Sequence, residues 1–511
     1  MTNEWDAVII GGGVAGLSAA QMLGRSRRRT LVIDAGEPRN RFAAHMHGVL
    51  GHDGMDPRAL LERGRAEARA YGVEIVEGAV ARLEDAGDGV LVHRADGTID
   101  TARAVVIAAG IRDDLPDIPG LSDAWGRAAL HCPYCHGWEV AGGALGVVMT
   151  SPAGIHQAQL VRQLSDRVTV FAAGGVPMGD DAMGRLAARG VSVVAAAVVG
   201  VAPRGDRLVI ATADGEERVL DAIFIAGAPV LDLAFADGFD LARADMPGAP
   251  LDVDLMGRTS HPRVFAAGNV TAPFGNVPVS MASGSMAGAG VNAVLTEEDF
   301  DRAVAERTAE RNAGWEERYA AEDRFWSGRV NGSVAAVVAS FEPGTALDVG
   351  SGEGGDVVWL AEQGWEATGV DVSPTAVRRA TALAAERGVE ARFVVGDGVG
   401  SVVGEFDLVL AGFLHSWEPD FPRIGMLRAA ADRVAPGGRL LIVSHAAPPP
   451  WAREVPDHAP AMRSPAEERA LLDLDPAEWE VELEEVRKRA VTAPDGSPAE
   501  LDDGILLFRR R

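Results

Sequence analysis

A glycine fingerprint near the start of the chain limits the possible fold more than any other feature of the sequence. The apolar run 6–10 is typical of a buried strand, and Gly11, Gly13 and Gly16 follow it before a helical pattern. In a strand–turn–helix unit these glycines allow a tight turn, the approach of a pyrophosphate, and close packing of helix on strand. Asp34, at the end of a second predicted strand, can accept hydrogen bonds from ribose hydroxyls. The pattern predicts a Rossmann-like dinucleotide-binding domain.

Length, charge and hydropathy narrow the class of protein. At about 100–200 residues per domain, the 511 residues predict about three domains. The net charge of −26 argues against nucleic acid or an anionic membrane as a partner. The apolar N-terminus lacks the basic region of a signal peptide, and the apolar stretch 191–202 is too short to span a bilayer. We expect a cytoplasmic enzyme.

The chain has two cysteines, Cys132 and Cys135, which are separated by Pro and Tyr and followed by His136. Such a pair can bind zinc, form a structural disulfide or transfer electrons. We expect no metal, because His131 and His136 lie too close along the chain to complete a tetrahedral zinc site. So short a loop removes little entropy from the unfolded chain, which argues against a structural disulfide. The pair predicts redox catalysis, and a disulfide that only senses oxidant is the alternative.

Two further apolar runs, 104–110 and 263–268, flank the cysteine pair. With the fingerprint they resemble low-molecular-weight thioredoxin reductases over about the first 300 residues. In that family an inserted pyridine-nucleotide domain splits an FAD-binding domain, which implies FAD as cofactor. The resemblance places Gly110, Gly268 and Asn269 at the FAD, with Asn269 toward the ribityl chain where the family usually has Asp. It also implies a helix, beginning near Val279, whose positive end faces the flavin.

The inserted domain departs from thioredoxin reductases where those proteins carry a second glycine fingerprint. Met149, Thr150 and Ser151 stand in place of the clustered glycines. No arginine pair follows the next predicted strand, in the segment 172–175, to hold the 2′-phosphate of NADPH. We expect the domain to keep its fold and leave NADPH binding open. An NAD(P)H-dependent disulfide reductase is therefore the alternative among enzymes.

The segment 132–139, with 38–40 upstream, resembles dithiol oxidases of the gliotoxin and holomycin type. Those flavoproteins oxidise a small-molecule dithiol to its disulfide and pass the electrons to O2. The resemblance implies that Cys135 faces the flavin and that Cys132 reacts with the substrate sulfur. It implies that His136 is the acid/base where the wider family has Asp, and makes Asn40 a candidate FAD contact. A homodimer is expected.

A second glycine-rich loop begins the last third of the chain. Asp348, Gly350 and Gly352 follow a predicted strand, and two further predicted strands end at Asp371 and Asp397. The series resembles class I S-adenosyl-L-methionine-dependent methyltransferases over residues 312–511, and a flanking motif with Trp326 resembles the tellurite-resistance and thiopurine branch. The resemblance implies that the glycines admit the methionine end of the cofactor, Asp371 binds its ribose and Asp397 its adenine amine. An NAD-binding Rossmann domain is the alternative.

No base for the methyl acceptor stands out. His415, Trp417 and His445 follow predicted strand ends, where a doubly wound sheet has its ligand crevice. A thiolate or selenide needs little help from a base because it is already ionised or nearly so. The expected acceptor is a small thiol.

The sequence therefore predicts an α/β protein: a two-domain FAD/NAD(P)-Rossmann-like flavoprotein followed by a doubly wound class I methyltransferase domain. The FAD-binding domain is expected over 1–113 and 243–298, and the inserted domain with the cysteine pair over 114–242. A connector helix and the methyltransferase domain are expected over 299–511. The predicted enzyme oxidises small dithiols and methylates small thiols.

Overall fold

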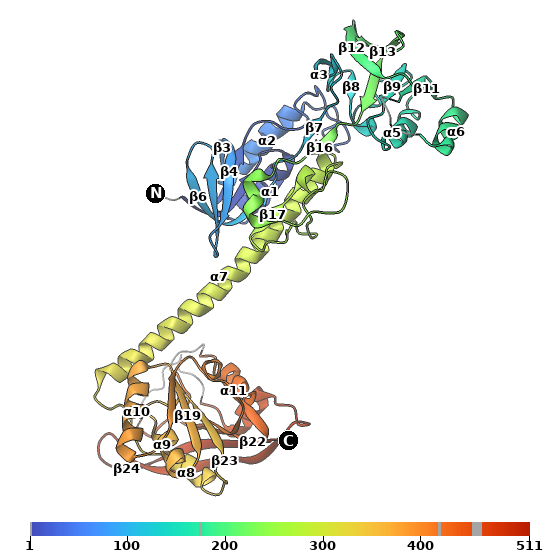
Figure 1. The fold of residues 1–511 in the computed structure, drawn as a ribbon. Coiled ribbons are helices and arrows are strands. Elements are labelled where there is room, and N and C mark those ends of the chain that lie inside the picture. The colour runs from blue at the N-terminus through green and yellow to red at the C-terminus, as the bar shows by residue number, and fades with distance from the viewer. Residues whose placement is uncertain (1–2, 173–175, 177, 417–420, 452–461) are drawn as a thin grey trace. The chain divides into compact units, whose positions relative to one another are not determined.

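The glycine fingerprint lies between β1 (Asn3–Ile10) and α1 (Val14–Arg25). The computed structural model describes residues 3–172, 176, 178–416, 421–451 and 462–511 (Figure 1). Met1–Phe300 and Asp301–Arg511 form two separate compact units. Both are α/β, as predicted, and the domain boundaries inside the first unit stay a prediction. Among the described residues, none of the helices has the length and apolar character that a bilayer crossing requires.

A seven-stranded sheet forms the base of the first unit. Its parallel strands are β3 (Glu74–Glu77), β2 (Thr30–Asp34), β1, β6 (Ile99–Ile107) and β17 (Val264–Ala266). The antiparallel strands β5 (Val90–Arg94) and β4 (Val80–Asp85) continue from β6. The middle of β1 is apolar throughout because both of its faces are covered: Val8 and Ile9 are fully buried in different core clusters. Helices α1 and α2 (Pro57–Ala70) pack together.

The inserted segment has its own parallel sheet, as the sequence predicts. Its strand order is β11 (Ser192–Val194), β10 (Val168–Phe171), β9 (Leu145–Val148), β15 (Ala222–Ile225) and β8 (Ala129–Leu130). An antiparallel sheet of β12 (Val198–Arg204), β13 (Arg207–Thr212) and β14 (Glu217–Leu220) accompanies it. The segment also contains α3 (Leu121–Ala124), α4 (Pro133–His136), α5 (Gly154–Val161) and α6 (Asp180–Ala188). β7 (Arg112–Asp114) and β16 (Ala228–Val230) pair where the chain enters and leaves it.

The second unit contains a seven-stranded doubly wound sheet. The strand order is β20 (Arg392–Val395), β19 (Glu366–Asp371), β18 (Thr345–Val349), β21 (Phe406–Gly412), β22 (Val434–His445), β24 (Pro498–Arg510) and β23 (Trp479–Thr492). Its helices are α8 (Gly332–Val338), α9 (Gly355–Glu362), α10 (Pro374–Arg387), α11 (Arg423–Ala431) and α12 (Pro465–Leu472). The chain order reverses between β18 and β21, which is where such sheets bind ligands. The antiparallel pair β23 and β24 was not among the predicted strands.

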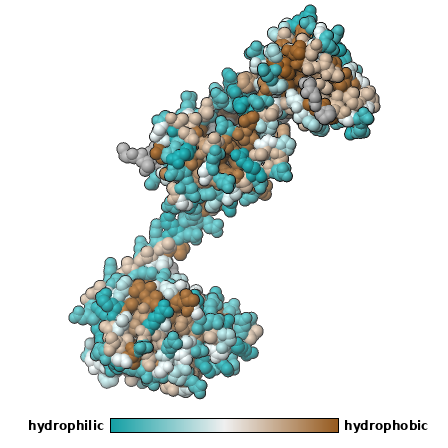
Figure 2. Space-filling model, in the orientation of Figure 1, coloured by the Kyte–Doolittle hydropathy of each residue, from teal (hydrophilic) through white to brown (hydrophobic). Residues whose placement is uncertain are grey.

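One helix, α7 (Val277–Ala321), replaces two predicted ones. The sequence predicts a helix beginning near Val279 and a separate connector with an opening helix over 297–324. The chain between them holds no proline, so the helix continues through both, although this stretch contains Gly284, Gly288 and Gly290. Ala287 and Leu295 are buried in the first unit, whereas the stretch 301–307 is exposed and mostly hydrophilic (Figure 2).

Candidate active sites

A cavity of about 760 Å³ opens at the carboxyl ends of β1, β2 and β6 in the first unit. It brings together most of the residues predicted to act there: Gly11, Gly13, Asp34, Asn40, Gly110, Cys132, Cys135, His136, Gly268 and Asn269. Two predicted residues are not part of its lining. Gly16 lies beneath the turn, and Val279 is 47% exposed, while Val277 and Ser280 of the same helix end line the cavity.

The three fingerprint glycines have two different roles: Gly11 and Gly16 allow close packing, and Gly13 borders open space. Gly11 has a φ of +105°, and a Cβ there would lie 2.4 Å from the carbonyl oxygen of Ala108. A Cβ on Gly16 would lie 1.9 Å from the carbonyl oxygen of Gly11, so both positions exclude a side chain. Gly13 is different, because a Cβ there would meet nothing within 4 Å. It caps α1, so the first N–H groups of the helix border open space suited to an anion.

Asp34 is held by a residue that the sequence did not indicate. Arg65 Nη2 of α2 lies 2.7 Å from Asp34 Oδ2, and the N–H of Gly36 donates to Oδ1 at 3.1 Å. Burial alone would raise the pKa of Asp34, but the hydrogen bonds from Arg65, Gly36 and Gly12 outweigh it and lower the pKa. The carboxylate is therefore an ionised acceptor on the cavity wall. Arg65 carries no local motif that could have identified it.

Cys132 and Cys135 form a disulfide at the cavity, with their Cα atoms 5.2 Å apart. The chain makes a single turn here: the N–H groups of Cys135 and His136 donate to the carbonyl oxygen of Cys132 at 3.1 and 3.2 Å. Pro133 suits the first position of this turn because its φ is already fixed for it. Tyr134 and Trp138, which flank the second cysteine, are 78% and 85% exposed. The predicted redox pair thus lines the cavity and has two exposed aromatic side chains close to it in the sequence.

His136 also lines the cavity. Burial lowers its pKa, Glu139 partly opposes this, and His47 lowers the pKa further. Glu139 Oε1 lies 3.2 Å from His47 Nε2, and His47 Nδ1 lies 3.3 Å from Asp53 Oδ2. His136 is therefore a neutral imidazole at neutral pH, able to accept a proton.

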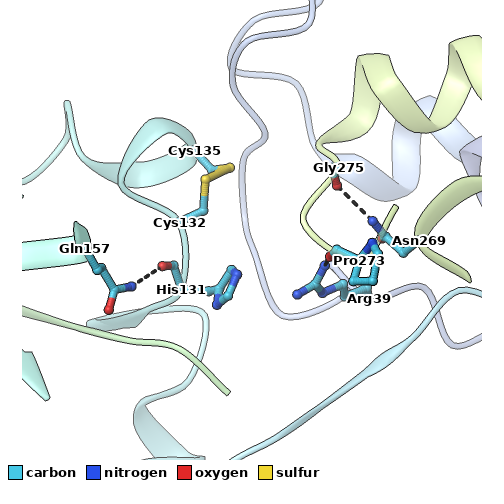
Figure 3. The surroundings of a disulfide bond; sticks show 8 residues. All are labelled: Arg39, His131, Cys132, Cys135, Gln157, Asn269, Pro273 and Gly275. Carbon is cyan, nitrogen blue, oxygen red and sulfur yellow. Dashed lines mark hydrogen bonds between the residues drawn. A yellow bond between two sulfur atoms is a disulfide. The ribbon is translucent and has the colours of Figure 1, made fainter. Parts of the chain in front are cut away.

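His131 is a second imidazole at the cavity, and from the sequence it is only a rejected zinc ligand. Figure 3 shows it beside Cys132, with its ring toward Arg39. The backbone oxygen of His131 accepts a hydrogen bond from Gln157 Nε2 at 2.7 Å. Burial and then Arg39 lower the pKa of the ring, against Asp113 and a backbone hydrogen bond to Ile225. Its Nδ1 is buried and has no hydrogen-bond partner among the described residues.

Asn269 uses its amide to fix the loop that leads into α7. Nδ2 donates to the carbonyl oxygens of Ala272 and Gly275, each at 2.9 Å (Figure 3 draws the second). A carboxylate could not donate these bonds. This gives a physical reason for Asn where thioredoxin reductases usually have Asp.

Larger side chains replace the clustered glycines at the second fingerprint region of the inserted segment. Met149 is fully buried, and a Cβ on Gly154 would lie 2.7 Å from its Cγ. Thr150 Oγ1 donates to the carbonyl oxygen of Ala226 at 2.9 Å. These contacts pack the β9–α5 connection. Of the segment 172–175, in which no arginine pair occurs, residues 173–175 lie outside the described residues.

A second cavity, of about 520 Å³, lies within Asp301–Arg511. All the predicted residues of this half line it: Trp326, Asp348, Gly350, Gly352, Asp371 and Asp397. Gly350 and Gly352 have φ of +76° and +54°, which favours glycine in this loop.

Three carboxylates of this cavity influence one another: Asp348 and Asp371 are buried and Asp356 is partly buried. Asp371 Oδ2 accepts from the N–H of Gly352 at 2.8 Å, and Oδ1 accepts from that of Ser373 at 2.9 Å. Burial raises the pKa of Asp371, and these two hydrogen bonds only partly offset it. Burial, with Asp356 and Asp371 as charged neighbours, raises the pKa of Asp348 well above its usual range. The arrangement favours a cationic ligand.

The end of α7 supplies a wall of this cavity that the sequence did not indicate. Arg311, Trp315 and Tyr319 line it. Arg311 Nη2 lies 3.7 Å from Asp397 Oδ1, so the carboxylate expected to bind an adenine amine already faces a guanidinium. Tyr319 accepts a hydrogen bond from Trp326 Nε1 at 3.1 Å.

Aromatic rings meet at the carboxyl ends of β21 and β22. The rings of His415 and His445 stack with centroids 5.6 Å apart, and the ring of Phe413 lies 4.5 Å from that of His445. The backbone N–H of His445 donates to His415 Nε2 at 3.4 Å. Burial, with Arg423 and His445, lowers the pKa of His415 to about 3, so its ring stays neutral. Trp417 lies outside the described residues.

Residues 5–287 match the family model described as pyridine nucleotide-disulphide oxidoreductase. The chain belongs to this family. Residues 346–438 match a methyltransferase domain. The oxidoreductase is therefore fused to a methyltransferase, as the sequence predicts, with FAD as the cofactor of the first unit and S-adenosylmethionine as that of the second.

Known proteins resemble the oxidoreductase half. Thioredoxin reductase tcpT of Claviceps purpurea (strain 20.1) is 31% identical over 300 residues, which cover 56% of this chain and 93% of tcpT. Thioredoxin reductase sirT of Leptosphaeria maculans is 30% identical over 309 residues, with 56% and 93% covered. The crystal structure of HlmI is 40% identical with a TM-score of 0.58, and the match covers 60% of this chain and 99% of HlmI.

The residues present fit both cofactors of this oxidoreductase–methyltransferase. In the first cavity, the open space at Gly13 suits a pyrophosphate, and His131 Nδ1 is a buried polar atom in want of a partner. In the second unit, Ser351 Oγ and Asn312 Oδ1 are likewise buried without a hydrogen-bond partner among the described residues, and both residues line the cavity. Polar ligands would satisfy these atoms. The described residues contain no group of three or more His, Cys, Asp or Glu suited to a metal ion.

Proposed function

We propose that the oxidoreductase unit converts small-molecule dithiols to disulfides and passes the electrons to O2 instead of drawing them from NADPH. The observation that carries the proposal is a contrast inside one unit. The Cys132–Cys135 disulfide lines the cavity suited to FAD, whereas Met149 and Thr150 stand at positions where a second nucleotide fingerprint would have glycines.

The proposed reaction uses the cysteines in turn. A substrate thiolate attacks Cys132 Sγ, which breaks the disulfide and leaves Cys135 as a thiolate. The second substrate sulfur then displaces Cys132, so that the product disulfide forms and both cysteines are reduced. FAD, when bound, accepts the two electrons, and O2 finally becomes H2O2. His136, neutral beside the pair, takes the proton of the attacking thiol.

We infer that the methyltransferase unit methylates the sulfur of small thiols. The acceptor end of its cavity presents Phe413, His415 and His445, rings that suit the polarisable sulfur of a small thiol. Oxidation and S-methylation both silence a reactive thiol, which gives the fusion a chemical logic. A homodimer and a cytoplasmic location belong to the same proposal.

An anaerobic titration tests the oxidase function against its alternatives. NADPH and then dithiothreitol are added to the purified protein while flavin absorbance is followed. We expect stoichiometric bleaching by the dithiol and little by NADPH, and then repeated turnover with H2O2 formation once air is admitted. Rapid bleaching by NADPH would support the NAD(P)H-dependent reductase. A single reduction without turnover would support a redox sensor.

A further inference from the structure

We propose that Asp356 takes the proton from the methyl acceptor, so that the second unit can methylate thiols that are not already ionised. The inference rests on the proposed S-methylation and supplies its missing base. In the sequence Asp356 is only a polar residue that follows the glycine-rich loop, and it gives no sign of this role.

The orientation of the Asp356 side chain supports the assignment. Asp356 lies in the first turn of α9 and lines the cavity. The backbone N–H of Asn331 donates to Oδ1 at 2.6 Å and fixes the carboxylate. The other oxygen, Oδ2, lies at the last residue of β21: a Cβ on Gly412 would be 3.3 Å from it. Since Phe413 follows directly, Oδ2 lies at the end of the cavity that carries the aromatic rings.

The neighbouring carboxylates are less suited to the task. Both oxygens of Asp371 already accept backbone hydrogen bonds. Asp348 is only 3% exposed, whereas Asp356 is partly accessible. Among these three acids, Asp356 is the most exposed, and its Oδ2 accepts no hydrogen bond from the residues that the structure describes.

The surroundings of Asp356 favour proton transfer near neutral pH. Burial raises its pKa to about 6, and the hydrogen bond from Asn331 opposes this only in part. The charged neighbour from β18 is Asp348, whose pKa is itself raised by Asp356. After β21, His415 is neutral, and Arg489 of β23 is paired with Asp503 at 2.7 Å. An acid of this strength is ionised at pH 7–8 yet holds a proton well enough to act as a base.

The proposed step on a neutral thiol begins with proton transfer. The S–H bond of the acceptor breaks and its proton passes to Asp356 Oδ2. The sulfur electron pair forms the bond to the methyl carbon, whose bond to the sulfonium of S-adenosylmethionine breaks with the pair left on that sulfur. The proton then leaves Asp356 for solvent.

The test compares Asp356→Asn with the wild-type full-length protein on two thiols. Benzyl mercaptan is protonated at pH 7, whereas 4-nitrothiophenol is already ionised. We expect methyl transfer to benzyl mercaptan to fall by roughly 10²–10⁴-fold, and transfer to 4-nitrothiophenol to stay near the wild-type rate. Calorimetry should find the affinity for S-adenosylhomocysteine unchanged, because Asn keeps the acceptor for the N–H of Asn331. Asp432→Asn, at an exposed Asp after α11, is the matched control and should leave both rates unaltered.

The other outcomes are distinguishable. An equal loss on both thiols, or a loss of S-adenosylhomocysteine binding, would make Asp356 a structural or cofactor-binding residue and overturn the proposal. Asp356→Glu, which keeps a carboxylate, should regain part of the benzyl mercaptan rate and its rise with pH; a rate no better than that of Asp356→Asn would also contradict it. If the wild-type protein methylates neither thiol, the S-methylation function itself fails.

Discussion

Single side chains in this protein have tasks that only their hydrogen bonds reveal. Asn269 stands where thioredoxin reductases usually have Asp, and its amide closes the loop before α7 by donating to two carbonyl oxygens. The two cysteines share one turn of chain but have different proposed partners, Cys132 the substrate and Cys135 the flavin. Single substitutions at Asn269 and at each cysteine therefore have different expected results.

Asn269→Asp should weaken FAD retention and lower the stability of the first unit. The new carboxylate cannot donate, so the carbonyl oxygens of Ala272 and Gly275 would lose their two hydrogen bonds and face a negative charge. Leaving such carbonyl oxygens without a donor costs roughly 1–3 kcal/mol. Denaturant unfolding and the rate of FAD release measure the effect. Binding of S-adenosylhomocysteine by the second unit serves as an internal control. Unchanged FAD release would show that the loop does not depend on this amide.

Cys132→Ser should keep FAD and leave Cys135 as a free thiolate beside it, giving a long-wavelength absorbance band. Cys135→Ser should lack the band, and both variants should lose dithiol oxidation because no disulfide can form. Absorbance spectra recorded across a pH series test this. A band in Cys135→Ser instead would exchange the assigned roles.

At the scale of elements, a carboxylate from one helix caps another. Ser373 caps α10 through its own side chain, which accepts from the N–H of Ala376 at 3.0 Å. Glu316 of α7 adds a second cap: it accepts from the N–H of Thr375 at 3.1 Å and from the hydroxyl groups of Ser373 and Thr375. A negative charge at a helix N-terminus is favourable, so this contact ties the end of α7 to the cofactor-binding sheet.

Glu316→Ala should destabilise the second unit by roughly 0.5–2 kcal/mol, as the loss of a helix cap does. The effect should depend on pH. Burial would raise the pKa of Glu316, but the hydrogen bonds of Ser373 and Thr375 outweigh it and lower the pKa. Its stabilisation is therefore full above the ordinary Glu pKa of about 4.3 and is lost as the pH falls through the lowered value. Unfolding of the variant and the wild type at pH 7 and at pH 3 should show a difference that shrinks in acid.

Glu317→Ala, at the exposed neighbouring position, is the control for this experiment and should change stability little. An equal effect of the two substitutions would mean that helix propensity, and not the cap, accounts for the loss.

The elements that could be predicted are those with a local signature. The fingerprint at Gly11 and the loop at Gly350 combine apolar strands with glycine spacing, and the predicted strands follow from such runs. The strand β23 has no such run, because it is largely exposed and rich in charged residues. Its sequence therefore lacks the apolar pattern by which a buried strand is predicted. Arg65, Glu316 and Asp356 could not be predicted as site residues, because each acquires its role from a partner distant in sequence.

For the molecule as a whole, the two cavities lie in separate units, and none of the residues that the structure describes lines both. The fusion therefore predicts two activities that can be removed one at a time. Coupling between them would require a change in one cavity to be transmitted to the other, and the residues proposed for the two reactions share no hydrogen bond.

Asp371→Ala should reduce affinity for S-adenosylhomocysteine about tenfold or more and leave dithiol oxidation near the wild-type rate. The substitution removes the proposed ribose acceptor and also leaves the N–H groups of Gly352 and Ser373 without their partner, at a cost of roughly 1–3 kcal/mol. Calorimetry and an oxidase assay on the same preparation test both halves. A collapsed oxidase rate in a folded variant would mean that the units communicate.

The continuity of α7 limits the positions at which recombination could join an intact methyltransferase unit to another protein. The match to the methyltransferase domain begins at residue 346, yet Arg311, Trp315 and Tyr319 already line the cavity and Glu316 caps α10. A recombination breakpoint at residue 346 would separate the enzyme from part of its own binding site. A gene fragment that preserves this binding site must encode the whole of Asp301–Arg511. The first residues of that unit belong to α7, the same helix that ends the flavoprotein unit.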